Sequence, residues 1–166
     1  MTVILIGFMG VGKTTIAQAL AAEFQLSQLD NDQFLCQREQ QTIAQLFQLY
    51  GEVGFRQREL QACRAAIQQA PQVLALGGGI IESATSREFL QQQANVLWLQ
   101  SDFATCWQRI QTTTSRPLVQ SLQESGLADR FQKRQKWYHQ VATDVMDIGQ
   151  QSPLDLATQI YQKYFK

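Results

Sequence analysis

Features that would mark several classes of protein are scarce or missing in this 166-residue sequence. Lys and Arg together number 14, as do Asp and Glu, so the formal net charge at pH 7 is zero. Non-specific binding to nucleic acid or to an anionic membrane surface depends on a basic electrostatic field. The neutral balance therefore argues against nucleic acid and membranes as partners.

Cysteine and histidine are also few. Cys36, Cys63 and Cys106 are dispersed along the chain, and His139 is the single histidine. An odd number of scattered cysteines does not suit a disulfide framework, and one isolated histidine does not suit a zinc site. Both observations favour a reducing compartment, so we expect a cytoplasmic protein.

Long apolar runs and linkers are missing too. The first apolar run is too short to span a bilayer, and no basic segment precedes it as it would in a signal peptide. The sequence contains neither an internal repeat nor a Pro/Gly-rich linker. At this length we expect residues 1–166 to form a single domain.

What the sequence does contain is an alternation of short apolar runs with longer amphipathic segments. The predicted strands cover residues 3–6, 28–30, 73–76, 96–99 and 145–148. The predicted helices include residues 13–24, residues 42–50 and a last helix that begins at Ser152 and Pro153. Strands that are apolar on both faces are typical of a parallel sheet covered by helices on each side. The pattern predicts a three-layer α/β domain.

Two regions depart from this alternation. Residues 31–72 have helical patterns but no strand, which indicates an insertion at the rim of the sheet. Residues 109–127 are polar and poor in periodicity. A long loop in a compact domain is usually a lid, a binding loop or disordered, so both regions are candidates to close over ligands.

The first apolar run leads into a phosphate-binding pattern, "GFMGVGKTT". Gly7, Gly12, Lys13 and Thr14 match the P-loop spacing, with a predicted strand before it and a predicted helix after it. Backbone N–H groups of such a loop and the helix N-terminus converge on phosphate oxygens. Lys13 would reach the β- and γ-phosphates, and the Thr14 hydroxyl would ligate Mg²⁺. The alternative is an ordinary glycine turn before a helix, which the strand–loop–helix context disfavours.

A P-loop alone does not separate kinases from GTPase switches or motor ATPases. A switch would usually carry an N/T-K-x-D motif and a D-x-x-G motif, and neither occurs in the sequence. These absences favour a small-molecule kinase.

Acidic residues follow the second predicted strand. In "LDNDQ", Asp30 and Asp32 are two residues apart, and on an extended segment such residues share a face. Both carboxylates could then point toward a metal and an acceptor. The alternative is that they cap the next helix.

Charged residues and glycines downstream could receive an acceptor. Arg56 and Glu59 are three apart on a predicted helix and can pair, although a surface ion pair is the alternative. In "LALGGGII", residues 77–79 follow an apolar strand, at the sheet edge where α/β proteins bind ligands, or they form a flexible turn. Arg116 in "SRPLV" could neutralise charge during phosphoryl transfer. Arg134 in "KRQKWY" is a second candidate, or simply a solvated helix residue.

Together these segments resemble the shikimate kinases in order and spacing, over essentially the whole chain. The elements "GEVGFRQRE" and "GGG" distinguish this family from gluconate and adenylate kinases. The resemblance implies ATP-dependent phosphorylation of the 3-hydroxyl of shikimate, a step toward chorismate and aromatic amino acids. It also implies a five-stranded parallel sheet, a substrate-binding segment near residues 31–61, a lid near residues 112–126 and a monomer.

The resemblance further assigns site residues at matching positions. Arg56 and Arg134 would hold the acceptor carboxylate, with Glu59 orienting Arg56. Asp32 would bind ring hydroxyls and act as the candidate base, while Lys13 and Arg116 neutralise the transferring group. The remaining substrate contacts would come from the glycine loop, Gly77, Gly78 and Gly79. The nucleotide would contact Gly10, Val11, Gly12, Lys13, Thr14, Thr15, Arg109, Arg116 and Pro153. Mg²⁺ would be held by Thr14 and, through water, by Asp30.

Two other functions remain open from the sequence. Another small-molecule kinase, for gluconate or a nucleoside monophosphate, would share the P-loop but use different acceptor contacts. A non-catalytic nucleotide-binding module would bind ATP without releasing ADP in response to an acceptor.

Overall fold

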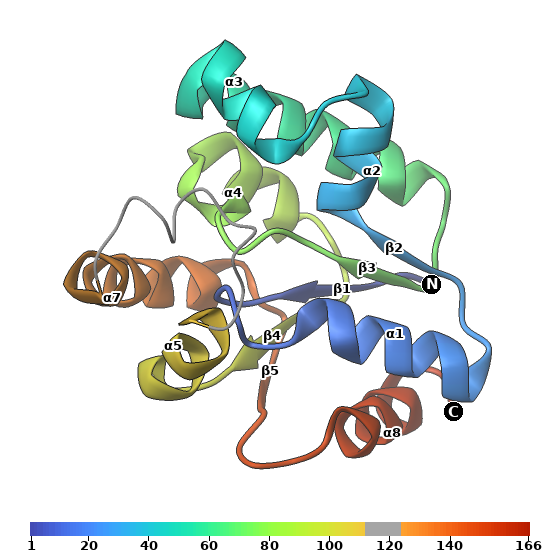
Figure 1. Ribbon diagram of the computed structural model, residues 1–166. Helices are drawn as coiled ribbons and strands as arrows, with labels where there is room; N and C mark the ends of the chain where they lie inside the picture. Colours follow the sequence, from blue (N-terminus) through green and yellow to red (C-terminus); the bar gives the residue numbers. More distant parts are fainter. Residues whose placement is uncertain (112–123) are drawn as a thin grey trace.

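The protein is organised around a parallel β-sheet, seen near the centre of Figure 1. A computed structural model describes residues 1–111 and 124–166. The five strands, in chain order, are β1 (Val3–Ile6), β2 (Gln28–Asp30), β3 (Val73–Ala75), β4 (Val96–Gln100) and β5 (Asp144–Asp147). Every predicted strand is confirmed, and no boundary differs from its prediction by more than one residue.

The strand order is β2-β3-β1-β4-β5, with all neighbours parallel. Strand β1 is central and fully buried, and its Leu5 lies opposite Ala75 on one side and Leu97 on the other. Since all strands point the same way, the segments that follow β1, β2 and β3 emerge at the same edge of the sheet. This edge brings the P-loop, Asp30 and the glycine loop together.

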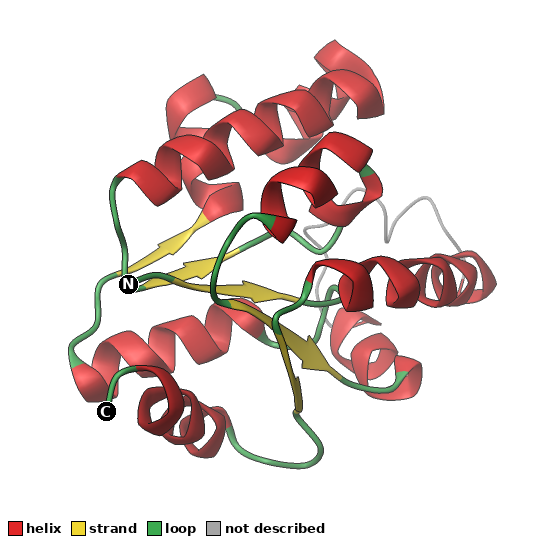
Figure 2. Cartoon of the chain, turned by 180° about the vertical axis from the view of Figure 1, so that it is seen from behind, coloured by secondary structure: helices red, strands yellow, loops and turns green. Residues whose placement is uncertain are grey.

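Helices cover both faces, which confirms the three-layer α/β prediction (Figure 2). They are α1 (Lys13–Phe24), α2 (Asn31–Glu39), α3 (Ile43–Gln68), α4 (Ala84–Gln91), α5 (Phe103–Gln111), α7 (Glu124–Val141), α8 (Pro153–Tyr164) and the short 3₁₀ helix η1 (Ile80–Glu82). Helices α1 and α8 pack together on one face, where the rings of Phe24 and Tyr161 stack 4.0 Å apart. Helices α3 and α4 lie on the other side, and α4 packs against α7 (Figure 1).

The predicted insertion between β2 and β3 consists of α2 and α3, and these described residues contain no strand. The helix predicted for residues 42–50 is the first part of the longer α3, which begins with a reciprocal cap between Thr42 and Gln45. Helix α3 is interrupted at Gly51, whose φ of 64° and ψ of −177° are not helical. A side chain would strain this conformation, so glycine allows the bend.

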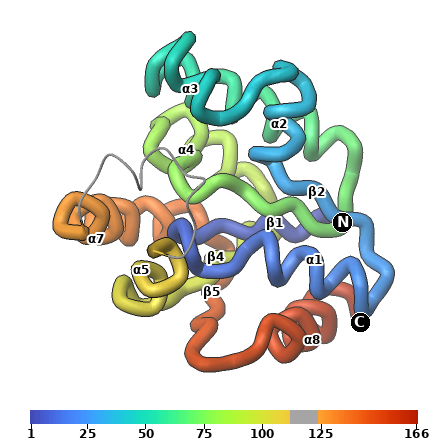
Figure 3. The backbone as a smooth tube through the Cα atoms, viewed as in Figure 1, coloured from blue at the N-terminus to red at the C-terminus, as the bar shows by residue number. Residues whose placement is uncertain are grey.

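The hydrophobic core lies between the sheet and its helices. Ile16 and Leu20 of α1 and Ile160 of α8 are buried against one face. Complete burial of such a side chain contributes about 1.5–3 kcal/mol. Both termini lie on the same side of the molecule, away from α5 and α7, as the backbone tube in Figure 3 shows.

Candidate active site

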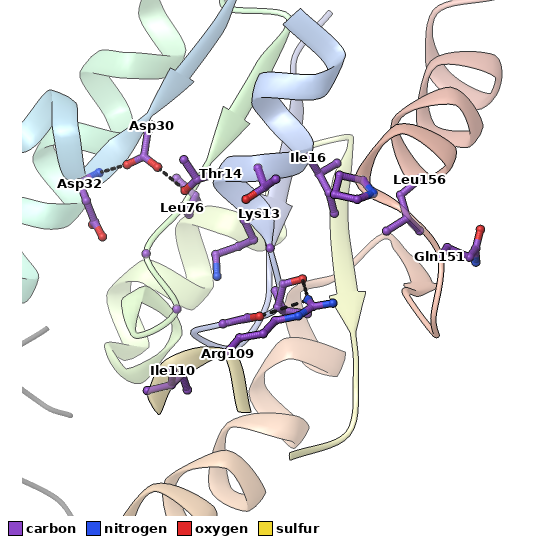
Figure 4. Close-up of a pocket in the computed structure, with 17 residues that line it drawn as sticks. Lys13, Thr14, Ile16, Asp30, Asp32, Leu76, Arg109, Ile110, Gln151 and Leu156 are labelled. Carbon is purple, nitrogen blue, oxygen red and sulfur yellow. Dashed lines mark hydrogen bonds between the residues drawn. The ribbon is translucent and has the colours of Figure 1, made fainter. Parts of the chain in front are cut away.

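A cavity of about 400 Å³ opens at the sheet edge where the strands end (Figure 4). Its lining brings together predicted residues from distant parts of the sequence. They are Gly10, Val11, Gly12, Lys13, Thr14, Thr15, Asp30, Asp32, Gly77, Gly78, Arg109 and Pro153. Ile16, Leu76, Ile110, Gln151 and Leu156 complete the lining and were not predicted.

The N-terminus of α1 faces this cavity without a side-chain cap. Helices α2, α3, α4 and α8 are each preceded by an N-cap residue whose side chain accepts a hydrogen bond from a first-turn amide: Asp30, Thr42, Ser83 and Ser152. The N-cap position of α1 is instead Gly12, which has no side chain, and no described side chain caps this helix. Its first amides have no intrahelical acceptors. This end of α1 is therefore suited to receive a phosphate.

The P-loop is tightly folded on its own backbone. The buried Lys13 Nζ donates hydrogen bonds to the carbonyl oxygens of Gly7, at 2.8 Å, and of Phe8, at 3.1 Å. At Gly10, φ is +80°, and a Cβ would lie 2.7 Å from the carbonyl oxygen of Cys106. A side chain there would be strained and would clash with α5.

Arg109 connects α5 to the same loop. Its Nη1 donates to the carbonyl oxygens of Gly10, at 3.3 Å, and Val11, at 3.2 Å. Arg109 lines the cavity together with Pro153 and Gln151, which approach from the segment before and at the start of α8. In Figure 4, Arg109 and Gln151 lie away from the end of the cavity that holds Asp32.

Asp30 has two functions in the local structure. Its Oδ1 accepts hydrogen bonds from the backbone amides of Asp32 and Gln33 and so caps α2, as the alternative interpretation of this residue held. Its Oδ2 accepts a 2.7 Å hydrogen bond from the Thr14 hydroxyl (Figure 4). The prediction that Asp30 and Asp32 share an extended segment is wrong, because α2 begins at Asn31 and places Asp32 in its first turn. Both still line the cavity.

The pair formed by Thr14 and Asp30 fits Mg²⁺. This ion prefers oxygen ligands and is commonly held by one or two protein groups, substrate phosphates and waters. A hydroxyl and a carboxylate oxygen 2.7 Å apart beside the P-loop supply that donor set. Elsewhere in residues 1–111 and 124–166, no group of three or more His, Cys, Asp or Glu side chains gathers as a metal site.

Arg56 and Glu59 form a buried pair on α3. Arg56 Nη1 donates a 2.8 Å hydrogen bond to Glu59 Oε2, and the two residues are 8 % and 1 % exposed. The alternative of a surface ion pair is therefore wrong. Burial raises the pKa of Glu59 from its ordinary 4.5 to about 7, and the neighbouring Arg56 offsets only part of this effect.

The glycine loop separates the cavity from this pair. A Cβ at Gly77 would lie 2.7 Å from Asp32 Oδ1 and 2.8 Å from Glu59 Oε1, and a Cβ at Gly79 would lie 2.7 Å from Arg56 Cζ. Close packing therefore requires the glycines, rather than a flexible turn. The loop brings Asp32, which lines the cavity, next to Glu59 and Arg56, which do not.

Arg134 reaches the same region from α7. It is 1 % exposed, so the interpretation as a solvated helix residue is wrong. Its Nε donates a 2.8 Å hydrogen bond to Glu82 Oε1, and its guanidinium carbon lies 5.4 Å from the centre of the Phe8 ring. Arg56 Nη2 lies 3.8 Å from Glu82 Oε2, so the two arginines share one carboxylate.

Sequence reasoning missed Glu82 and Tyr138. Glu82 belongs to η1 and has no local pattern that would mark it. The Tyr138 hydroxyl donates a 2.5 Å hydrogen bond to the carbonyl oxygen of Gly78. Its position one helical turn after Arg134 is a signal that could have found it, because residues four apart share a helix face.

Part of the predicted lid lies outside the described residues. Arg116 is one of these residues, so its role stays a prediction. The described end of the predicted lid, residues 124–126, begins α7.

None of the described helices is long and apolar enough to cross a membrane.

The sheet order, the P-loop after β1 and the second, arginine-containing site beside the cavity define a P-loop kinase. Comparisons with known proteins identify its family. The profile of the family described as "Shikimate kinase" matches residues 9–165. The chain belongs to the shikimate kinase family.

Individual relatives agree over nearly the full length. The chain is 38% identical over 166 residues to the shikimate kinase of Lactococcus lactis, covering 99% of this chain and 98% of that protein. It is 36% identical over 163 residues to the shikimate kinase of Psychrobacter arcticus, covering 98% and 88%. Among solved structures, shikimate kinase from Acinetobacter baumannii in complex with shikimate superposes with a TM-score of 0.88 at 35% identity, covering 98% of this chain and 91% of that one.

Proposed function

We propose that this protein transfers the γ-phosphoryl group of ATP to the 3-hydroxyl of shikimate, giving shikimate 3-phosphate and ADP, in the cytoplasm. One observation carries the proposal beyond the family assignment. The buried Arg56 lies beside a glycine loop whose other side faces the P-loop cavity at Asp32, and the buried Arg134 shares the Glu82 carboxylate with Arg56. This arrangement suits an acceptor that bears a carboxylate at one end and a reactive hydroxyl at the other.

At the nucleotide end, the residues mainly position phosphates and neutralise charge, which is what phosphoryl transfer requires of a protein. The uncapped amides of α1 bind phosphate oxygens, and Lys13 exchanges its carbonyl contacts for the β- and γ-phosphates. Arg109 and Pro153 lie where they can contact the adenosine part. Thr14 and Asp30 would hold Mg²⁺, which supplies further charge neutralisation when bound.

At the acceptor end, Arg56 and Arg134 bind the carboxylate of shikimate, because planar guanidinium groups match carboxylate geometry. The backbone amides of Gly78 and Gly79 contact the ring. Asp32 orients the attacking hydroxyl and accepts its proton. Arg116, outside the described residues, would complete the charge neutralisation when the lid closes and excludes water.

A coupled assay of ADP release tests this function. Shikimate, gluconate and nucleoside monophosphates are each offered with Mg²⁺ and ATP, and acceptor-dependent ADP release is measured. We expect release with shikimate only. Release with gluconate or a nucleotide would identify a different small-molecule kinase, and nucleotide binding without any acceptor-dependent release would identify a non-catalytic module.

A further inference from the structure

Glu82 lies between the two arginines that the proposed function assigns to the acceptor carboxylate. Its Oε1 accepts a 2.8 Å hydrogen bond from Arg134 Nε and lies 2.7 Å from Arg134 Nη2. Its Oε2 lies 3.8 Å from Arg56 Nη2, and its Oε1 lies 3.6 Å from Arg130 Nη1. One carboxylate thus spans guanidinium groups from α3 and α7.

Both arginines keep donors that these carboxylates do not use. Arg134 presents its Nε and Nη2 to Glu82, and its guanidinium also interacts with the Tyr138 hydroxyl, while its buried Nη1 makes no hydrogen bond of good geometry within residues 1–111 and 124–166. Arg56 presents Nη1 to Glu59, while its buried Nε likewise lacks a hydrogen bond within the described ranges. Unsatisfied buried donors are costly, so they indicate a missing partner. An acceptor carboxylate would supply that partner.

The backbone at Glu82 is held in place by contacts that involve two neighbouring helices. Arg87 Nη1 on α4 donates to the carbonyl oxygens of Ile81, at 2.7 Å, and of Glu82, at 3.0 Å. The guanidinium of Arg87 in turn lies 4.8 Å from the centre of the Trp137 ring on α7. The backbone of η1 is therefore tied to α4 and, through Arg87, to the helix that carries Arg134. The Glu82 side chain is only 19 % exposed.

We infer that Glu82 is a positioning residue for acceptor binding, which holds Arg134 on one edge so that its remaining donor meets the carboxylate of the acceptor. The inference rests on the proposed function. Glu82 stands to Arg134 as Glu59 stands to Arg56, since each carboxylate fixes one edge of a guanidinium and leaves another edge available.

The opposite hypothesis is that Glu82 competes with the acceptor, because it already bridges both arginines. Geometry disfavours it. The close contacts of Glu82 are with Nε and Nη2 of Arg134, and its contact with Arg56 is long, at 3.8 Å. The two hypotheses predict opposite changes in affinity when Glu82 is neutralised.

Steady-state kinetics of Glu82→Gln test the inference, with shikimate and ATP varied separately. We expect the KM for shikimate to rise about tenfold, the lower end of the loss in affinity seen when a hydrogen-bond partner that orients a binding residue is removed. The kcat and the KM for ATP should change less than twofold. Glu82→Asp keeps the charge with a shorter reach, and its KM for shikimate should rise less. Glu88→Gln is the matched control, because Glu88 is an exposed residue of α4 six positions further on. Its kinetics should equal those of the unmodified protein.

An uncharged analogue of the acceptor distinguishes a role of Glu82 in positioning Arg134 from a general disruption of the acceptor site. Shikimate methyl ester lacks the charge that Arg134 recognises, so its inhibition constant should be the same for the unmodified protein and Glu82→Gln. An unchanged or lowered KM for shikimate in Glu82→Gln would overturn the inference, and so would equal losses for shikimate and its ester. Absence of shikimate-dependent ADP release from the unmodified protein would instead contradict the proposed function itself.

Discussion

The two ends of the cleft are built differently. The phosphate end is a continuous segment, residues 7–15, in which backbone groups and glycine conformations form the binding surface. The acceptor end is assembled from side chains of α2, α3, η1 and α7, residues that are far apart in the sequence. The first depends on local geometry, and the second depends on tertiary packing.

Charge is also handled differently at the two ends. The N-terminus of α1 is left uncapped, so a phosphate can take the place of a cap. At the acceptor end, Arg56 and Arg134 already face Glu59 and Glu82. Substrate affinity at that end therefore depends on how Glu59 and Glu82 orient the arginines. Substitutions at the two ends should accordingly change different kinetic constants.

The largest expected effect is on the phosphate end. Lys13→Met removes the cation that meets the transferring group, so we expect kcat to fall about 10²–10³-fold, as for loss of one transition-state donor. The KM for shikimate should stay within a few-fold of normal, because the acceptor contacts are elsewhere. Steady-state kinetics measure both constants. A kcat within tenfold of normal would show that Lys13 does not neutralise charge on the transferring phosphoryl group.

At the acceptor end, protonation of Glu59 should affect stability. The pKa of this residue is raised from 4.5 to about 7 in the folded protein, so its contribution favours folding at low pH and is lost as pH rises from about 4.5 to 7. Relative to Glu59→Gln, the unmodified protein should therefore lose about 2–3 kcal/mol of unfolding free energy between pH 5 and pH 8.

Denaturant unfolding of both proteins at the two pH values measures this difference. Glu88→Gln should follow the unmodified protein at both, because its side chain is exposed. A difference between the unmodified protein and Glu59→Gln that is the same at pH 5 and pH 8 would show that Arg56 keeps Glu59 ionised throughout.

The same type of substitution, glycine to alanine, should raise the KM of a different substrate at each end of the cleft. Gly10→Ala would place a Cβ 2.7 Å from the Cys106 carbonyl oxygen at a φ of +80°, and Gly79→Ala would place one 2.7 Å from Arg56 Cζ. We expect the first to raise the KM for ATP and the second the KM for shikimate, each about tenfold or more. If both variants raised both constants equally, the two ends would not be separable.

The smallest effect concerns Asp30, which serves both helix α2 and Thr14. Asp30→Asn keeps a good N-cap, whereas Asp30→Ala should lower the unfolding free energy by about 1 kcal/mol. Both variants should require more Mg²⁺ for half-maximal activity, because both lose the carboxylate. A normal Mg²⁺ requirement in Asp30→Asn would show that the Asp30 carboxylate does not help to bind the metal.

The same contrast explains what the sequence could predict. The P-loop, the strands and the last helix depend on local spacing, so β1 and α1 were predicted with the boundaries observed. The position of Asp32 in a helix was missed, because Asp30 caps α2 and the helix begins directly after the strand, with no extended residue between them. Burial of Arg134 and the location of Glu82 depend on contacts between α7 and η1, which no local pattern encodes.

The most direct test of the account is a crystal structure of this protein with shikimate and ADP. We expect the carboxylate of shikimate within hydrogen-bonding distance of both Arg56 and Arg134, with a ring hydroxyl beside Asp32 and facing the P-loop. Shikimate bound elsewhere, or bound with its carboxylate turned away from both arginines, would contradict the central claim.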